Sequence, residues 1–204
     1  MVRTRKKKPI VLCVCGMAGS GKSTLAKKLA EKYGLRYYSG GDALKALALI
    51  EGYHNLERGW WESEEGLRFL ERRDKDLKFD EEIDKKFLEV ARQGNVVLDS
   101  WTMPWLLKDG FNIWLEASVG KRAERIANRD RITVAEALEA LKSKEKQTKA
   151  IYKKLYGFSL GEDFEPFQFI LDTDSLGPDE AFQISCKVID NVVLKSRKPA
   201  KSNC

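Results

Sequence analysis

Histidine is scarce in this sequence, and Cys-x-x-Cys pairs are absent. His54 is the single histidine, and the four cysteines include no Cys-x-x-Cys pair, so a zinc site is not expected. Cys13 and Cys15 are two residues apart in an apolar run, which predicts that they share one face of a strand. Cysteines used in this way are small core residues or free thiols, as in a reducing compartment.

Long hydrophobic runs are also missing. No apolar run approaches the roughly 20 residues that a membrane-spanning helix needs. The N-terminal segment is basic and lacks the apolar core of a secretory signal. Hydrophobic residues make up 43% of the 204 residues and charged residues 33%, which is typical of one soluble globular domain. We therefore expect a cytoplasmic protein without a membrane partner.

Positive charge is in excess overall but not in the body of the chain. The net charge is +6, yet residues 1–8 carry five Lys or Arg and residues 195–204 carry four, with no acidic residue in either segment. Without these nine, 28 basic residues face 31 acidic ones, so residues 9–194 carry −3. We expect two basic, disordered tails around a mildly acidic domain. Nucleic acid would then contact the protein only weakly, through the tails.

Strand-like and helix-like segments alternate along residues 9–194. Continuous apolar runs predict strands covered on both faces, and helical periodicity bounded by Gly or Pro predicts helices. Strands are expected at 9–15, 35–39, 96–99, 111–117 and 167–171, and helices at 22–33, 42–50, 61–93, 119–129, 134–155 and 178–193. This alternation predicts an α/β fold, a doubly wound parallel five-stranded sheet between two layers of helices.

The first expected strand leads into a glycine-rich loop. Residues 16–23 read G-M-A-G-S-G-K-S and match the P-loop pattern G-x-x-x-x-G-K-[ST] throughout, between a buried strand and a helix. In such a loop the backbone N–H groups surround a polyphosphate, the lysine reaches its β- and γ-phosphates, and the serine hydroxyl ligates Mg²⁺. We therefore predict an ATP and Mg²⁺ site, with Lys22 catalytic and Ser23 on the metal. The expected nucleotide-binding residues are Gly16, Met17, Ala18, Gly19, Ser20, Gly21, Lys22, Ser23 and Thr24.

A carboxylate follows another short apolar strand. Val96, Val97 and Leu98 precede Asp99, which places Asp99 at the carboxyl end of the strand, where open α/β sheets bind their ligands. We predict that Asp99 is a catalytic residue that helps to hold the metal. The alternative is that it caps the segment that follows.

The class of P-loop protein is narrowed by two absences. The sequence has no N-K-x-D run of the kind that recognises guanine in GTPases, and it is too short for a large ATPase with sensor and oligomerisation elements. Two charged helical segments, 42–93 and 121–156, suit instead a small kinase with an acceptor-binding lobe and a lid.

A series of short motifs follows the P-loop in order. They are Y-S-G-G-D at 38–42, D-E-E-I-D at 80–84, G-N-V-V-L at 94–98, I-W-L at 113–115, R-A-E-R-I-A-N-R at 122–129, Y-K-K-L-Y-G at 152–157, L-D-T at 171–173 and L-G-P-D-E at 176–180. With them the sequence resembles the archaeal-type cytidylate kinases, of the nucleoside monophosphate kinase family, from about residue 10 to residue 190. The resemblance implies Mg-ATP as donor, CMP or dCMP as acceptor, and in-line phosphoryl transfer that needs no strong base.

Positive charge within the domain gathers in the expected lid. Residues 121–156 contain eleven Lys or Arg and five acidic residues, which gives this segment +6. Arg125 and Arg129 are four residues apart and share a helix face. By resemblance, Arg125 lies against the donor nucleotide and Arg129 reaches its phosphates, both as catalytic residues. The alternative for each is a solvated charged helix.

The resemblance fails at several acceptor-side positions. Trp101 stands where the family pattern V-V-L-E-G-R has arginine, and Lys45 also replaces an expected arginine. The lid pattern R-E-x-x-E-R-R-Y reads K-E-K-Q-T-K-A-I-Y at 144–152. Lysine lacks the planar fork with which arginine grips phosphate, so we expect altered acceptor recognition and few arginines on that side. The candidate substrate-binding residues are Ser39, Asp42, Lys45 and Trp101.

Several roles stay open at this point. Asp42 either caps a helix or holds the acceptor's sugar, and Trp60, Trp61, Trp101 and Trp105 either pack in a core or stack on a flat acceptor. Two rival functions also remain. One is a kinase for a nucleoside or another alcohol, with Asp42 or Asp99 as base. The other is a non-catalytic ATP-binding or RNA-associated factor that uses the tails.

Overall fold

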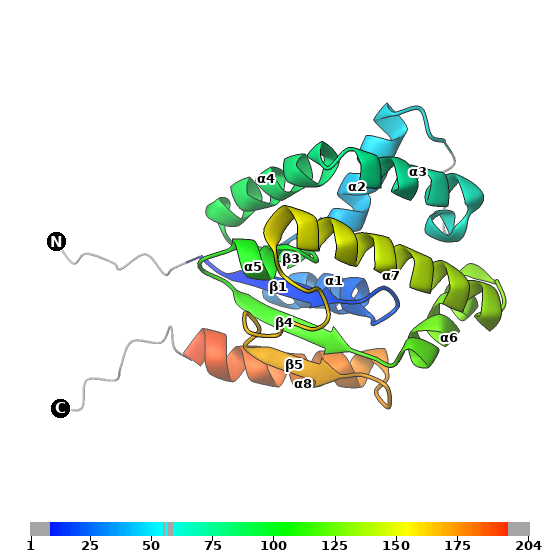
Figure 1. Cartoon of the computed structure of the whole chain (residues 1–204). Coiled ribbons are helices and arrows are strands. Elements are labelled where there is room, and N and C mark those ends of the chain that lie inside the picture. The colour runs from blue at the N-terminus through cyan, green and yellow to red at the C-terminus, as the bar shows by residue number, and fades with distance from the viewer. Residues whose placement is uncertain (1–8, 55, 57–58, 196–204) are drawn as a thin grey trace, which may run out of the picture.

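A single parallel sheet forms the centre of the molecule. The computed structural model describes residues 9–54, 56 and 59–195, so the basic tails lie outside the described residues except for Lys195. The strands are β1 (Val11–Gly16), β2 (Arg36–Ser39), β3 (Val96–Asp99), β4 (Phe111–Glu116) and β5 (Phe169–Asp172). They pair in the order β2-β3-β1-β4-β5, and every pair is parallel (Figure 1). The predicted doubly wound α/β fold with five strands is confirmed.

The helices follow the expected alternation, with two differences. They are α1 (Lys22–Tyr33), α2 (Gly40–Ile50), α3 (Glu64–Lys75), α4 (Lys78–Gln93), α5 (Met103–Leu106), α6 (Val119–Asp130), α7 (Val134–Tyr156) and α8 (Pro178–Ile189), with a 3₁₀ turn at Trp60–Glu62 and a π-helical turn at Asp190–Leu194. The segment 61–93, expected to be helical, is divided among the Trp60–Glu62 turn, α3 and α4, and the short α5 was not expected. Asp76 adopts an extended conformation and its carboxylate accepts a hydrogen bond from the Lys78 N–H, which ends α3 and starts α4.

The central strand β1 is covered on both faces. Leu12 and Val14 pack with α1 and α8 on one face. Cys13 and Cys15 point to the other face, where α4, α5 and α7 cover them. Burial raises the pKa of both thiols. The prediction that these cysteines share a strand face is confirmed, and both are buried free thiols of the core.

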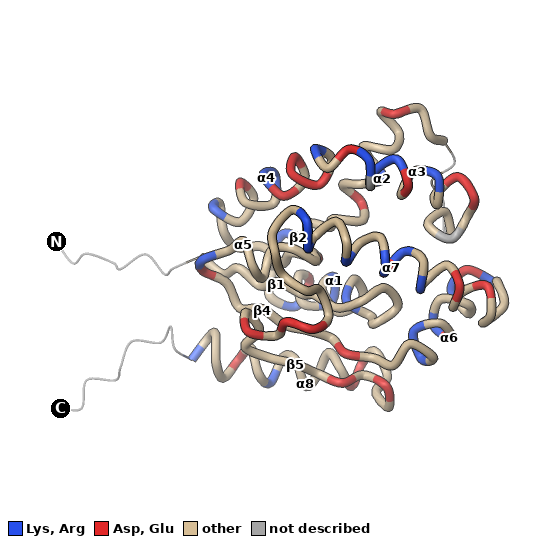
Figure 2. The backbone as a smooth tube through the Cα atoms, in the orientation of Figure 1, with Lys and Arg blue, Asp and Glu red and all other residues tan. Residues whose placement is uncertain are grey.

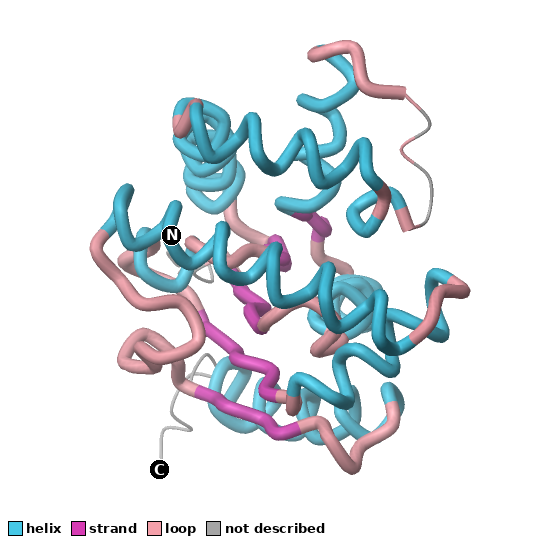
Figure 3. The backbone as a smooth tube through the Cα atoms, turned by 45° about the vertical axis from the view of Figure 1, so that its right-hand side comes forward, coloured by secondary structure: helices cyan, strands magenta, loops and turns pink. Residues whose placement is uncertain are grey.

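Helix α7 is a long helix that packs against several other elements of the molecule. It begins with a capping box between Thr133 and Glu136 and ends at Gly157, which adopts a left-handed conformation. Along its length it packs against α6, α3 and the Trp60–Glu62 turn, and Figure 3 shows it running between α6 and the helices above the sheet. Among the described helices, none combines the length and the apolar character needed to cross a membrane.

Candidate active site

The P-loop leaves the carboxyl end of β1 and fits closely against its neighbours. A Cβ at Gly16 would lie 2.6 Å from the Leu115 carbonyl oxygen, and one at Gly19 would lie 2.8 Å from the carbonyl oxygen of Arg122. Gly21, which precedes α1, has a left-handed φ of 96°. Side chains are therefore excluded from two of these positions by space, and disfavoured at the third by backbone conformation.

A cavity of about 430 Å³ opens on one side of this loop. The P-loop from Gly19 to Thr24 lines it together with Arg125, Arg129 and Thr173, and we call it the donor cavity. The Arg125 guanidinium donates to Thr173 Oγ1 at 3.0 Å and to the Ser20 carbonyl at 3.3 Å. Arg129 pairs with Asp130. Both arginines thus line the donor cavity, and each also has a protein partner.

Arg122 explains part of the positive charge in the expected lid. Its side chain is buried and donates to the Ala117 carbonyl at 3.0 Å and to the Ala18 carbonyl of the P-loop at 3.1 Å. It also forms an ion pair with Glu145 of α7. Lys149 pairs with Glu162 in the same region. Figure 2 shows basic residues spread along α6 and α7, with acidic ones among and beside them, so this charge is not one uniform cationic surface.

A second cavity, of about 160 Å³, lies on the other side of the P-loop. We call it the acceptor cavity. It shares Gly19, Lys22, Ser23, Ile126 and Arg129 with the donor cavity, so the two meet at the P-loop lysine. Its remaining walls come from α2, α3, α4, α7 and the segment after β3. Besides P-loop residues and Arg129, the predicted site residues that it contains are Ser39, Asp99 and Trp101.

Asp99 ends β3 beside the P-loop. It is 4% exposed, and the Tyr37 hydroxyl donates to its Oδ2 at 3.1 Å. It does not cap the short helix that follows, because Ser100 Oγ accepts from the backbone N–H groups of Thr102 and Met103 instead. The described residues contain no cluster of three or more His, Cys, Asp or Glu side chains that would cage a metal. One carboxylate and one serine hydroxyl suit Mg²⁺, which keeps several waters and takes further ligands from substrate phosphates.

The predicted residues of α2 lie differently from what was expected. Ser39 caps this helix, because its Oγ accepts from the Asp42 N–H at 3.3 Å. The alternative in which Asp42 is the cap is therefore wrong. The Lys45 ammonium donates to the Leu56 carbonyl at 2.9 Å. Among the described residues that line the acceptor cavity, neither Asp42 nor Lys45 is found.

Of the four tryptophans whose roles were left open, two pack against other aromatic rings and two line the acceptor cavity. Trp60 is buried against Phe69, and Trp105 stacks on Phe158 with ring centroids 3.8 Å apart. Trp61 lines the acceptor cavity, with the Lys144 ammonium 4.6 Å from its ring centroid. Trp101 also lines this cavity, and its indole N–H donates to the Gly16 carbonyl at 2.7 Å.

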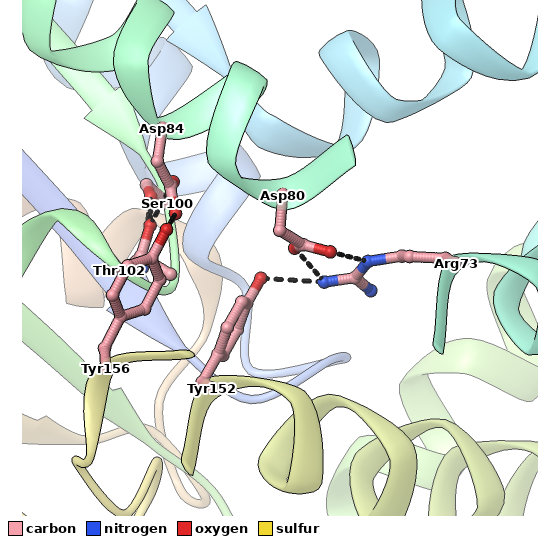
Figure 4. A network of polar contacts seen from close by, with 7 residues as sticks. All are labelled: Arg73, Asp80, Asp84, Ser100, Thr102, Tyr152 and Tyr156. Carbon is pink, nitrogen blue, oxygen red and sulfur yellow. Dashed lines mark hydrogen bonds and ion pairs between the residues drawn. The ribbon is translucent and has the colours of Figure 1, made fainter. Parts of the chain in front are cut away.

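Arg73 is a buried cation of the acceptor cavity that was not predicted from the sequence. Arg73 is 1% exposed; its Nε donates to Asp80 Oδ2 at 2.7 Å, and its Nη2 donates to Asp80 Oδ1 and to the Tyr152 hydroxyl at 3.0 Å (Figure 4). The acceptor cavity thus has an arginine from α3 in addition to Arg129. Arg73 and Asp80 flank the break between α3 and α4, which the helical periodicity did not reveal.

A second contact joins α4 to α7 beside the first. Asp84 accepts from Thr102 Oγ1 at 2.5 Å and from the Tyr156 hydroxyl at 2.7 Å (Figure 4). Burial raises the pKa of Asp84 to about 6, against the lowering effect of these two hydrogen bonds. Asp80 and Asp84 are four residues apart on α4, as Tyr152 and Tyr156 are on α7. Helix α4 is therefore linked to α7 in two places: directly between Asp84 and Tyr156, and through Arg73 of α3 between Asp80 and Tyr152.

The sequence itself places this site in a family. The family model described as the cytidylate kinase-like family matches residues 11–175. The chain belongs to the cytidylate kinase-like family. Curated relatives include the cytidylate kinases of Ignicoccus hospitalis, 39% identical over 83% of this chain and 92% of that one, and of Pyrococcus horikoshii, 33% identical over 91% of each. The resemblance drawn from the motifs is confirmed, and the protein is a kinase of this family.

Several solved structures have a fold similar to that of this protein. A shikimate kinase from Bacteroides thetaiotaomicron superposes with a TM-score of 0.55 at 16% identity, covering 90% of this chain and 99% of that one. A shikimate kinase from Acinetobacter baumannii, in complex with shikimate, gives 0.51 at 17% identity, covering 95% and 97%. At such identities the likeness concerns the fold alone.

Proposed function

We propose that this protein transfers the γ-phosphate of Mg-ATP to a nucleoside monophosphate, with CMP or dCMP as the first candidates. The observation that carries this proposal is the meeting of two cavities at Lys22. A phosphoryl group leaving the donor cavity would enter the acceptor cavity directly. The family membership and the names of the curated relatives support the choice of acceptor.

The donor cavity suits a polyphosphate. The P-loop offers backbone N–H groups around an anion, at the positive N-terminal end of α1. Lys22 would contact the β- and γ-phosphates from the floor shared by both cavities. Arg125 and Arg129 would then give up part of their contacts with Thr173 and Asp130 to face the donor. In this proposal residues 121–156 form the lid and residues 42–93 the acceptor-binding lobe.

Ser23 and Asp99 would hold Mg²⁺ at the same junction. Ser23 lines both cavities, and Asp99 lines the acceptor cavity from the end of β3. When bound there, Mg²⁺ would neutralise part of the negative charge of the phosphates during the transfer. The Tyr37 hydroxyl keeps the Asp99 carboxylate oriented beside the P-loop.

Catalysis would consist of positioning and charge neutralisation. The acceptor phosphate is already an anion, so the transfer needs no strong general base. What it needs is cations aimed at the transferred group, and Lys22 and Arg129 line both cavities. Arg73 and Lys144 add positive charge to the acceptor side, next to Asp80 and the ring of Trp61.

A substrate screen tests the proposal. The protein would be incubated with Mg-ATP and, in turn, CMP, dCMP, UMP, AMP, GMP, the free nucleosides and a set of small alcohols, with ADP release as readout. We expect release with CMP or dCMP well above that with the nucleosides. Selective turnover of a nucleoside or an alcohol would overturn the acceptor. Nucleotide binding without turnover of any compound would favour the non-catalytic alternative.

A further inference from the structure

The segment after β3 is bound to the end of β1 around Trp101. The Ser100 N–H donates to the Val14 carbonyl at 3.3 Å, and the Cys15 thiol lies 3.7 Å from the Trp101 carbonyl oxygen that accepts from it. The indole N–H then donates to the Gly16 carbonyl at 2.7 Å, the shortest of the three contacts. These contacts attach the segment that carries Asp99 to the point where the P-loop begins.

The partner of the indole is a backbone position with little freedom. Gly16 has a φ of 149°, and a Cβ there would lie 2.6 Å from both the Leu115 carbonyl oxygen and Ser20 Oγ. Its carbonyl orientation sets the direction in which the loop leaves β1. A hydrogen bond from Trp101 therefore fixes the start of the P-loop.

The indole ring also contacts the P-loop lysine. The Lys22 ammonium lies over the Trp101 ring, 5.3 Å from its centroid, which is within the range of a cation–π interaction. Trp101 is partly buried, so this contact is shielded from water on one side. A single side chain thus reaches both the first residue of the P-loop and its lysine.

We propose that Trp101 is a positioning residue for the donor nucleotide: its N–H fixes the Gly16 carbonyl while its ring holds the Lys22 ammonium at the junction of the two cavities. It does so at the position where the motif pattern predicts a phosphate-binding arginine. The inference rests on the proposed use of a nucleotide donor and is independent of the identity of the acceptor.

Two substitutions separate the two contacts. Trp101→Phe keeps an aromatic ring near Lys22 and removes the N–H, whereas Trp101→Leu removes both. Trp105→Phe is the matched control, because Trp105 also uses its indole N–H, donating to Asp163 at 2.9 Å, but it stacks on Phe158 and lines neither cavity. The measurement is the dissociation constant of Mg-ADP by titration calorimetry without any acceptor, together with the melting temperature of each variant.

Trp101→Phe should weaken Mg-ADP binding about 2- to 10-fold, as expected for the loss of one hydrogen bond. Trp101→Leu should weaken it by a further factor of about 2 to 30, the size of a partly buried cation–π contact. This further factor should disappear when the same pair is compared in a Lys22→Ala background, because the ring then has no ammonium to hold. Trp105→Phe should leave Mg-ADP binding unchanged even where it lowers the melting temperature.

Unchanged Mg-ADP binding in folded Trp101→Phe and Trp101→Leu proteins would overturn the inference. So would a Phe-to-Leu difference that persists without Lys22, since the ring would then act through packing alone. A wild-type protein that binds no Mg-ADP would instead contradict the proposed function. The two failures are therefore distinguishable.

Discussion

The donor and acceptor cavities meet at one lysine but are built in different ways. Consecutive P-loop residues from Gly19 to Thr24 line the donor cavity, and in our proposal their backbone N–H groups bind the phosphates. The acceptor cavity is assembled from α2, α3, α4, α7 and the segment after β3, and its charges are held in side-chain contacts such as Arg73–Asp80. The donor side is thus local in sequence, and the acceptor side depends on how distant helices pack.

The largest effect should come from Lys22, one of the five residues that both cavities share. Lys22→Ala removes the cation aimed at the phosphates, and we expect kcat to fall by at least about 100-fold, the scale on which one preorganised charge contact acts. The measurement is steady-state ADP release with the acceptor found in the screen. Full turnover by this variant would refute the P-loop mechanism.

On the acceptor side, Asp80→Asn should strongly destabilise the fold. It leaves the buried Arg73 guanidinium without its carboxylate, a change that costs about 3–5 kcal/mol in the free energy of unfolding. The control is Glu89→Gln, which breaks the exposed pair with Lys86 and should cost less than about 1 kcal/mol. Urea unfolding measures both. Equal stability of the two variants would show that the buried pair is not a structural tie.

A smaller effect is expected at the ion pair between Arg122 of α6 and Glu145 of α7. Glu145→Gln leaves Arg122 without its anion while its bonds to Ala117 and Ala18 remain, so we expect a loss of about 1–3 kcal/mol. Because Arg122 supports the P-loop, Mg-ADP binding should weaken as well. Glu124→Gln, which breaks the exposed Lys121 pair, is the matched control and should change neither quantity measurably.

The smallest effect is the pH dependence contributed by Asp84. Its pKa of about 6 in the folded protein lies above the value of about 3.9 for an exposed Asp, so the folded state binds the proton more tightly. This contribution therefore stabilises the fold as the pH falls from about 7 toward 4, by at most about 1.4 kcal/mol per pH unit. The difference in unfolding free energy between wild type and Asp84→Asn, measured from pH 7 to pH 4.5, should move in favour of the wild type. A constant difference would contradict the raised pKa.

The donor side could be predicted from the sequence because it is local in the chain, whereas the acceptor side depends on the packing of distant helices. The P-loop and Asp99 follow from short motifs beside buried strands, and the structure places both at the carboxyl edge of the sheet. Arg73 was missed because the break at Asp76 is invisible in a helical pattern that continues from Trp61 to Gln93. A single carboxylate after α3 creates that break.

For Lys45 and Trp101 the sequence identified the residue but did not predict where its side chain points. Lys45 was selected because an arginine was expected there, but its ammonium donates to the Leu56 carbonyl, a contact set by the path of the loop after α2. Trp101 was noticed as a departure from the family pattern. Its indole N–H donates to the Gly16 carbonyl because the segment after β3 packs on β1. Side-chain direction in both cases is a tertiary property.

The most direct test of the central claim, that the two cavities form one phosphoryl-transfer site, is to follow the products by ³¹P NMR with Mg-ATP and CMP. The account predicts CDP and ADP in equal amounts, with no inorganic phosphate. ATP consumption that yields inorganic phosphate and leaves CMP unchanged would contradict it.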